Sequence, residues 1–364
     1  MTAGSGAYAG SRLGLTINGK AVSGVAGQTI LDVARENGIR IPTLCYSPKI
    51  EPVGSCRLCL VEIEGVATPA TACTTPIRDG MVVETHTPAV EMLRRETLKL
   101  LLLRHPLNCA ACEIGGACEL EELVHEYDIS HADLHAYELD PLDLEMAPYA
   151  TPLIAYHPLR CIVCGRCVAA CTEITGAGAI AIQGSGATAR IAPAARDSGE
   201  RIECVSCGEC LAICPVNALT PAEHRPRHKP WETRAVQTTC AYCGVGCQLE
   251  LNVADNTVVG VSPHDDGVNH GALCVKGRFG YGFVNHEERL TDPLIREGDG
   301  WRIATWDEAL ELVGQRFADI CVESGGDAIA GLSSARCTNE ENYLFQKFFR
   351  GILGTNNVDH CARL

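Results

Sequence analysis

Two cysteine-rich stretches decide the fold: CIVCGRCVAAC at residues 161–171 and CVSCGECLAICP at residues 204–215. Both stretches share the spacing C-x2-C-x2-C-x3-C, and thiolates at this spacing hold [4Fe–4S] clusters. Because the spacing occurs twice in succession, the sequence predicts a duplicated unit with two clusters. In the whole sequence, 19 of the 22 cysteines fall into five separate sets of candidate metal ligands. The pattern therefore predicts a protein that moves electrons.

The duplicated unit resembles the bacterial two-cluster ferredoxin, in which the fourth cysteine of each run ligates the other cluster. The resemblance implies one ligand set of Cys161, Cys164, Cys167 and Cys214, and a second set of Cys171, Cys204, Cys207 and Cys210. Thr172 stands where the first copy would have a proline. This departure weakens the turn and removes no ligand.

Upstream of this unit lies a set of four cysteines carried by loops: Cys45, Cys56, Cys59 and Cys73. Four thiolates from loops suit a [2Fe–2S] centre. A zinc site is the alternative, because C-x2-C pairs also bind zinc, although no second pair completes a zinc ribbon. The long gap after Cys45 resembles the amino-terminal ferredoxin domain of respiratory complex I large subunits and iron hydrogenases.

The stretch HPLNCAAC at residues 105–112 combines a histidine with two cysteines and is followed by Cys118. It resembles the [4Fe–4S] site with one histidine and three cysteine ligands in the same families. The resemblance implies the ligands His105, Cys109, Cys112 and Cys118. A neutral imidazole in place of a thiolate changes the net charge of a cluster and so its potential. The other histidines are interpreted as ordinary surface or core residues.

The fifth set is Cys240, Cys243, Cys247 and Cys274, followed by the stretch VKGR at residues 275–278. It resembles the [4Fe–4S] domain that opens the catalytic subunit of molybdenum or tungsten bis-pterin enzymes. The resemblance implies that Lys276 lies between cluster and pterin and relays electrons; the alternative is an ordinary exposed lysine. The remaining cysteines lack ligand spacing and are predicted to be small buried residues: Cys321, Cys337 and Cys361.

Length, charge and apolar content limit the number of domains, the partners and the cellular location that we expect. A length of 364 residues predicts several domains, and a net charge of −15 argues against a nucleic-acid partner. Residues 1–20 contain neither an apolar signal segment nor a twin-arginine pair. The best apolar run, residues 100–103, is far too short to span a membrane. We therefore expect a soluble cytoplasmic protein with reduced thiols.

Local patterns predict the elements that carry the first ligand sets. Residues 15–23 have the alternation and Asn-Gly turn of a β-hairpin, and residues 29–37 a helix ended by Gly38. Short strands are expected at residues 60–63 and 82–83, which together fit a β-grasp ferredoxin. A helix over residues 88–103 then leads into the loop at His105.

The carboxyl-terminal part of the sequence shows patterns typical of strands and helices in alternation. Residues 328–332 predict a strand, and a capping box at residues 338–341 predicts a helix start. The apolar and aromatic residues of that helix are predicted to be core: Tyr343, Leu344, Phe348 and Phe349.

The predicted fold class is an α+β multidomain iron–sulfur protein, with boundaries near residues 140–152 and in the connector at 221–230. The domains are a β-grasp [2Fe–2S] ferredoxin (12–87), a helical histidine-ligated [4Fe–4S] domain (88–146), a 2x[4Fe–4S] ferredoxin (147–230), a [4Fe–4S] domain of molybdopterin oxidoreductases (233–288) and the incomplete start of an α/β molybdopterin-binding domain (289–364).

GLSSARCTNEENY at residues 331–343 and NNVDHCARL at residues 356–364 closely resemble the start of the pterin-binding domain in formate dehydrogenases. The resemblance implies that the residue after Leu364 is the cysteine or selenocysteine that ligates molybdenum or tungsten, so no catalytic residue lies within the chain. An end at this point suggests a selenocysteine codon read as a stop. The order of the domains is expected to distinguish formate dehydrogenases from two related families. Complex I large subunits would lack the two-cluster ferredoxin, and iron hydrogenases would have different domains after it.

The resemblance as a whole implies the alpha (large catalytic) subunit of an NAD-linked formate dehydrogenase. Formate would be oxidised to CO2 at a bis-molybdopterin guanine dinucleotide with Mo or W. Electrons would pass through four [4Fe–4S] clusters and one [2Fe–2S] cluster to a flavin-containing diaphorase subunit and a small [2Fe–2S] subunit. Two alternatives stay open: a non-catalytic electron-transfer module, or a complex I-like NADH dehydrogenase large subunit.

Overall fold

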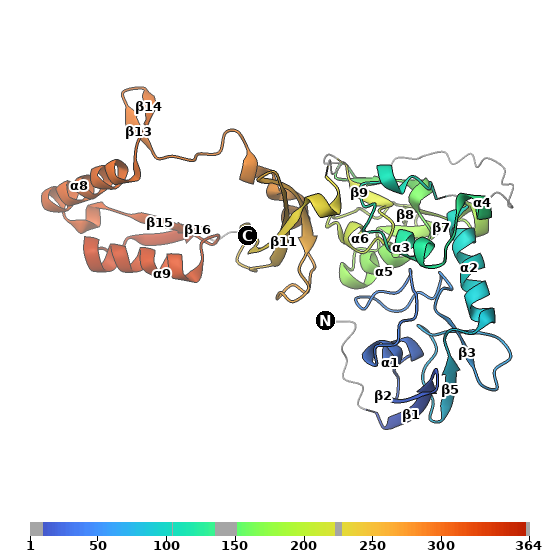
Figure 1. The fold of residues 1–364 in the computed structure, drawn as a ribbon. Helices are drawn as coiled ribbons and strands as arrows, with labels where there is room; N and C mark the ends of the chain where they lie inside the picture. Colours follow the sequence, from blue (N-terminus) through green and yellow to red (C-terminus); the bar gives the residue numbers. More distant parts are fainter. Residues whose placement is uncertain (1–9, 104, 135–150, 223–227, 362–364) are drawn as a thin grey trace.

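The computed structural model describes residues 10–103, 105–134, 151–222 and 228–361. In Figure 1 the segments from blue to yellow-green lie against one another, and a three-stranded sheet follows them. The red α/β segment lies at the opposite end, joined to that sheet by an extended stretch. Among the described residues, no helix has both the length and the apolar character to cross a bilayer.

A β-grasp sheet opens the chain and confirms the predicted hairpin, helix and strands. Its five strands are β1 (Arg12–Ile17), β2 (Lys20–Val25), β3 (Leu60–Ile63), β4 (Ala70–Thr71) and β5 (Met81–Glu84), in the order β2-β1-β5-β3-β4. Asn18 and Gly19 both have positive φ, as the tight turn between β1 and β2 requires. Strands β1 and β5 pair in parallel, so β1 lies between β2 and β5, and β5 is the central strand of the sheet.

Helix α1 (Ile30–Glu36) packs on this sheet. It begins at Thr29, whose side chain accepts from the Asp32 backbone N–H while the Asp32 carboxylate accepts from the Thr29 N–H. Such a capping box satisfies two backbone donors of the first turn. Ile30 and Leu31 are fully buried, and each such side chain contributes about 1.5–3 kcal/mol.

The second segment is helical. It comprises α2 (Pro88–Leu102), the short 3-10 turn η1 (Cys109–Ala111), α3 (Glu119–Glu126) and α4 (His131–Leu134). Arg94 of α2 is fully buried, and its guanidinium donates to the carbonyls of Leu58 and Leu60 at 2.9 and 2.8 Å. Helix α2 is thereby attached to the strand that follows Cys59.

The third segment has the duplicated architecture expected of a two-cluster ferredoxin. Its elements are β6 (Ile154–Tyr156), η2 (Pro158–Arg160), α5 (Arg166–Ala169), η3 (Ala170–Ile174), β7 (Ile180–Gln183), η4 (Gly186–Thr188), β8 (Arg190–Pro193), α6 (Glu209–Ala212) and β9 (Leu219–Pro221). Strand β6 pairs with β9, and β7 with β8. Gly165 and Gly208 precede α5 and α6 with φ of 81° and 78°, so the two halves repeat the same backbone.

The fourth segment is a three-stranded antiparallel sheet with helical turns beside it. Its elements are η5 (Pro230–Glu232), β10 (Arg234–Thr239), β11 (Gln248–Ala254), β12 (Thr257–Pro263), α7 (Val275–Phe279) and η6 (Gly280–Asn285). Asp255 and Asn256 connect β11 to β12 with positive φ at both positions, which is typical of a hairpin turn.

The last segment contains a hairpin and a small α/β unit. Its elements are β13 (Leu294–Glu297), β14 (Gly300–Ile303), α8 (Trp306–Ser324), η7 (Gly326–Ala328), β15 (Gly331–Ser334), α9 (Asn339–Phe348), η8 (Phe349–Leu353) and β16 (Val358–Cys361). Strands β15 and β16 run parallel. The predicted capping box is confirmed, because Thr338 and Glu341 exchange side-chain to backbone hydrogen bonds.

Three expectations for this segment were wrong. The strand predicted at 328–332 forms only at Gly331–Ser334, because Gly326–Ala328 forms a 3-10 turn first. Tyr343 and Leu344 are each 61% exposed and Phe348 is 40% exposed, since α9 packs through one side only. The fourth predicted core residue, Phe349 at the start of η8, is buried as expected.

Cys337 is exposed because it lies in the turn before α9, while Cys321 is half-buried beside the small core of this segment. The side chain of Cys361 lies outside the described residues, as does most of the predicted boundary at 140–152 and part of the connector at 221–230. In the described part of that connector, Lys229 donates to the Ala110 carbonyl at 2.8 Å and so contacts the second segment.

Candidate iron–sulfur sites

The four loop cysteines of the first set are brought together in the core. All four are at most 4% exposed: Cys45, Cys56, Cys59 and Cys73. The sulfurs of Cys59 and Cys73 lie 3.3 Å apart. Two sulfurs on one tetrahedral metal would lie roughly 3.8 Å apart for bonds of about 2.3 Å. The close approach of these two thiols therefore suits a shared iron.

Contacts among these thiols favour the thiolate form at Cys45 and Cys59, whereas hydrogen bonds to those two thiols, together with burial, raise the pKa of Cys56 and of Cys73. A hydrogen bond from Cys73 lowers the pKa of Cys59 to about 7. Hydrogen bonds from Cys56 and then Cys73 hold the pKa of Cys45 well below its usual range. The Leu44 N–H also donates to the Cys56 sulfur at 3.4 Å. Because thiolates are the ligands of iron and zinc, the site is chemically fit for a metal.

Within the described residues, no three His, Cys, Asp or Glu side chains converge on a point where one metal ion could be held. A zinc ion needs its ligands at about 2.0–2.3 Å from a single point. In an iron–sulfur cluster the thiolates are divided among several irons and so stand around a larger group. Four thiolates around such a group are what the predicted [2Fe–2S] centre requires, and zinc stays the alternative for the first set.

Two cavities in the ferredoxin segment gather the cysteines of both runs. One small cavity is lined by Cys161, Cys164, Cys167 and Cys214. A second small cavity is lined by Cys171, Cys204, Cys207 and Cys210. In each cavity the fourth thiol comes from the other run, which is the grouping that the crossover arrangement requires. Burial raises the pKa of Cys164 to about 12, so a bound cation such as iron is needed to hold that thiol as thiolate.

Backbone N–H groups point at the sulfurs in the same pattern in both halves. Val163 and Ser206 donate to the cysteine two residues before them, each at 3.4 Å. Ala179 and Ala218 donate to Cys171 and Cys214, each at 3.3 Å. Hydrogen bonds to sulfur are one means by which a protein sets cluster potential. The positive φ of Val163 and Ser206, 52° and 53°, accompanies this contact and is unusual for a β-branched valine.

His105 is oriented by the neighbouring ferredoxin segment. Its Nδ1 lies 3.0 Å from the carbonyl oxygen of Arg160, and a carbonyl can only accept, so Nδ1 carries the proton. Burial lowers the pKa of His105, which favours the neutral ring. Nε2 therefore keeps its lone pair, as a metal-ligating histidine requires.

The three thiols that would complete this second site lie in the same loop region. Burial raises the pKa of Cys118, and the Cys112 thiol adds to the effect. Burial, Glu121 and Cys112 together raise the pKa of Cys109. The Cys118 thiol lies 3.6 Å from the carbonyl oxygen of Pro215, so this loop adjoins the end of the second cysteine run.

The fifth set gathers at the base of the three-stranded sheet. The Cys240 N–H donates to the Cys247 carbonyl at 2.8 Å. Burial raises the pKa of Cys247, and the thiols of Cys240, Cys243 and Cys274 contribute as neighbours. Cys243 and Cys274 are exposed, so this site is more open than the others.

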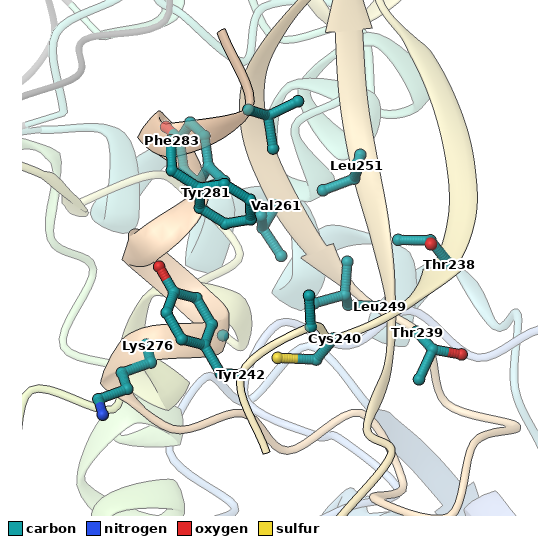
Figure 2. Close-up of a pocket in the computed structure, with 13 residues that line it drawn as sticks. Thr238, Thr239, Cys240, Tyr242, Leu249, Leu251, Val261, Lys276, Tyr281 and Phe283 are labelled. Atoms are coloured by element: carbon teal, nitrogen blue, oxygen red, sulfur yellow. The ribbon is translucent and has the colours of Figure 1, made fainter. Parts of the chain in front are cut away.

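Lys276 lies beside this fifth site. Figure 2 shows the Cys240 sulfur directed into a pocket whose wall also carries Lys276 and the rings of Tyr242, Tyr281 and Phe283. Lys276 belongs to α7, which begins directly after Cys274. Its side chain is exposed. The structure thus places the lysine next to a ligand loop; a relay role remains a prediction.

Shared apolar cores join the sites. One core contains Cys45, Cys56 and Cys164, and Cys118 packs against it. The Ser55 hydroxyl donates to the Cys164 carbonyl at 2.8 Å across the same contact. A second core contains Cys167 and Cys210, with Phe279 of α7 packed against it. The first four sites therefore adjoin one another, and α7 connects the fifth to them.

Comparison with known proteins gives five matching family descriptions in chain order. They are "2Fe-2S iron-sulfur cluster binding domain" at 10–88, "NADH-ubiquinone oxidoreductase-G iron-sulfur binding region" at 94–133, "NADH-quinone oxidoreductase subunit 3, ferredoxin-like domain" at 151–220, "Molybdopterin oxidoreductase Fe4S4 domain" at 233–286 and "Molybdopterin oxidoreductase" at 289–364. By these matches the chain is a multidomain iron–sulfur protein, in which iron–sulfur domains precede a match to a molybdopterin oxidoreductase domain. Its front resembles the iron–sulfur subunit of NADH-quinone oxidoreductases.

Relatives of this iron–sulfur protein have several names. NADPH-Fe(3+) oxidoreductase subunit alpha of Geobacter sulfurreducens is 38% identical over 96% of this chain and 40% of the relative. An NADH-quinone oxidoreductase subunit of Rhizobium meliloti is 38% identical over the same shares. A Staphylococcus aureus protein named as a candidate formate dehydrogenase is 31% identical over 96% of this chain and 39% of that protein. The chain thus spans about 40% of the length of these curated relatives.

A solved structure is also similar. One chain of the crystal structure of NAD+-reducing [NiFe]-hydrogenase in the H2-reduced state matches with a TM-score of 0.52 and 30% identity. The match covers 59% of this iron–sulfur protein and 90% of that chain.

The ferredoxin match corrects one expectation. Module order was expected to set complex I large subunits apart, because they would lack a ferredoxin between the first and last modules. A ferredoxin-like domain described from NADH-quinone oxidoreductase subunit 3 matches residues 151–220, so this argument does not separate the two families.

Proposed function

We propose that the chain is the electron-transferring front part of a formate dehydrogenase catalytic subunit. The observation that carries the proposal is the unbroken series of cysteine sites, which starts beside the molybdopterin segment and ends in the β-grasp core. A series of adjoining cluster sites provides single-electron steps through the protein.

The proposed cofactors follow from the thiol groupings. The first set would hold one [2Fe–2S] cluster, and the other four sets one [4Fe–4S] cluster each. The chain's own contribution is to bury the cysteines of the first set completely and those of the two ferredoxin sets in part, and to donate N–H groups to sulfur. His105 would serve as a neutral ligand whose orientation is fixed by Arg160.

In the complete subunit, a bis-molybdopterin guanine dinucleotide with Mo or W would supply formate oxidation to CO2. Lys276 is our candidate relay from that centre to the Cys240 site, since it lies beside the ligand loop. As the ligand of that metal is expected after Leu364, we propose that residues 1–364 alone carry electrons without turning over formate.

The proposed partners are a flavin-containing diaphorase subunit that reduces NAD and a small [2Fe–2S] subunit. The names of similar proteins support them, because those proteins are subunits of NADH- or NADPH-linked oxidoreductases or belong to an NAD+-reducing hydrogenase. A cytoplasmic location suits thiolate ligands, which need a reducing compartment.

A second candidate function is that of a complex I-like NADH dehydrogenase large subunit. Two family descriptions named for NADH oxidoreductases match residues 94–133 and 151–220, and the Rhizobium meliloti relative is 38% identical. In that case electrons would enter from NADH and no formate chemistry would occur.

The two candidates differ in which donor reduces the clusters. The complete subunit, purified without oxygen together with its partners, would be mixed with formate or with NADH and its clusters followed by EPR. Reduction by formate, with NAD reduced in turn, supports the first candidate. Reduction by NADH combined with no response to formate, in protein shown to contain molybdenum or tungsten, contradicts it.

A further inference from the structure

A buried ion pair lies between two of the cluster sites. Glu209 and Arg278 have side chains only 6% and 5% exposed, and the Arg278 Nη2 donates to Glu209 Oε1 at 2.8 Å. Most other ion pairs of the described residues join side chains that water reaches. Removing two charges from water costs several kcal/mol per ion, which close contact must offset. The free-energy cost of burying these two charges suggests that the pair has a function.

The pair is attached to the ligand loops on both sides. Glu209 immediately precedes Cys210 and lines the cavity that the second ferredoxin set surrounds. Its Oε1 also accepts the backbone N–H of Leu273 at 2.9 Å, and Leu273 immediately precedes Cys274. One carboxylate oxygen of Glu209 therefore contacts the loop of the fifth site, while the backbone of Glu209 belongs to the loop of the fourth site.

The backbone of Gly208 packs closely against Arg278 of the pair. A side chain at Gly208 would place its Cβ 2.7 Å from Arg278 Cγ and 3.1 Å from Phe279 Cζ. Gly208 is thus the point where the ferredoxin backbone meets α7. The loop of Cys207 and Cys210 and the helix after Cys274 are in direct contact here.

We propose that Glu209 and Arg278 are positioning residues for electron transfer between the Cys204–Cys210 site and the Cys240–Cys274 site. The inference rests on the proposed electron-transfer function. The pair fixes the two ligand loops against each other, and its opposite charges balance one another beside both clusters. Each charge by itself would bias the potential of the adjacent clusters.

The sign of that bias follows from electrostatics. Reduction adds one negative charge to a cluster, so a nearby cation stabilises the reduced state and a nearby anion destabilises it. Glu209→Gln keeps the shape and an oxygen acceptor for Leu273 but leaves Arg278 unbalanced, which raises the potentials. Arg278→Gln leaves Glu209 unbalanced, which lowers them. The double variant removes both charges and returns the potentials toward those of the parent protein.

The test is a redox titration by EPR of the anaerobically purified full chain. Signals of the two sites are assigned by their loss in Cys207→Ala and Cys243→Ala. We expect each single variant to change the one-electron reduction equilibrium of at least one of these clusters about tenfold, or about 59 mV, in opposite directions. The double variant should lie close to the parent. Glu200→Gln, in an exposed pair with Arg196 of the same segment, is the matched control and should shift nothing.

Shifts of the same sign in both single variants, or no shift in either, would overturn the inference. If a single variant loses its clusters, the double variant decides: recovered clusters support the pair, and continued loss contradicts it. A parent protein without iron in these two sites is a separate result, because it refutes the proposed function itself.

Discussion

At the scale of single residues, the ligands are positioned by neighbours that carry no metal-binding group. The Arg160 carbonyl determines which nitrogen of His105 is protonated, and the Arg160 guanidinium binds Glu113, the residue after Cys112, at 2.7 Å. One residue of the ferredoxin segment thus contacts the second site's loop at two points, His105 and Glu113. The spacing of His105 from the following cysteines identified it as a candidate ligand, but no sequence pattern indicated a role for Arg160.

His105→Ala should alter the EPR signal of one [4Fe–4S] cluster and leave the others intact, because only one cluster would lose a ligand. His105→Cys should retain that cluster at a lower potential, since a thiolate adds negative charge. His125→Ala on the exposed face of α3 is the control. Unchanged spectra in His105→Ala would show that the histidine is not a ligand.

Gly208 is expected to be far less tolerant than a glycine with similar backbone and open surroundings. Gly186 also has positive φ, but an added Cβ there would meet nothing within 4 Å. Alanine at either position costs about 1–2 kcal/mol for the left-handed backbone. Gly208→Ala should cost about 1–3 kcal/mol more through crowding against Arg278. Equal thermal unfolding midpoints for Gly186→Ala and Gly208→Ala would contradict the close packing of the two loops.

At the scale of elements, helix α2 connects the β-grasp sheet to the second site. Arg94 in its middle donates to the two carbonyls that flank Cys59 by one residue on each side, those of Leu58 and Leu60. The helix continues to Leu102, shortly before His105. Movement of α2 would therefore disturb the first two sites together.

Arg94→Met should destabilise the β-grasp domain because two carbonyls would lose their buried donor. Each unsatisfied buried acceptor costs about 1–3 kcal/mol, so a total of about 2–6 kcal/mol is expected. Urea unfolding followed by the visible absorbance of the [2Fe–2S] centre measures it. Arg196→Met, on the protein surface, serves as the control. A loss no greater than that of the control would show that Arg94 does not hold the sheet.

The elements near ligand sets could be predicted because local chemistry determines them. The Asn18–Gly19 turn, the capping box at Thr29 and the repeated C-G-x-C turns at Gly165 and Gly208 each depend on residues close in sequence. The exposed side of α9 could not be predicted, since exposure depends on which distant segments cover a helix. The Glu209–Arg278 pair was missed for the same reason, as 69 residues separate its partners.

At the scale of the whole molecule, the sites are arranged from the molybdopterin segment to the β-grasp domain. The α7 helix packs against the core of the second ferredoxin site, and the first ferredoxin site shares a core with Cys45 and Cys56. In Figure 1 the α/β segment that carries α8 and α9 lies at one end and the β-grasp sheet at the other. Under the proposed function, the two ends would have different roles, one toward the metal chemistry and one toward the electron partner.

The iron content of the anaerobically purified 364-residue chain, measured with its EPR spectra at stepwise potentials, tests the central claim most directly. One [2Fe–2S] and four [4Fe–4S] clusters correspond to about 18 iron atoms per chain and five separate reducible signals. We expect that result. Zinc at the first site, or iron and signals for fewer than five clusters after full reconstitution, would contradict the account of a continuous series of electron carriers.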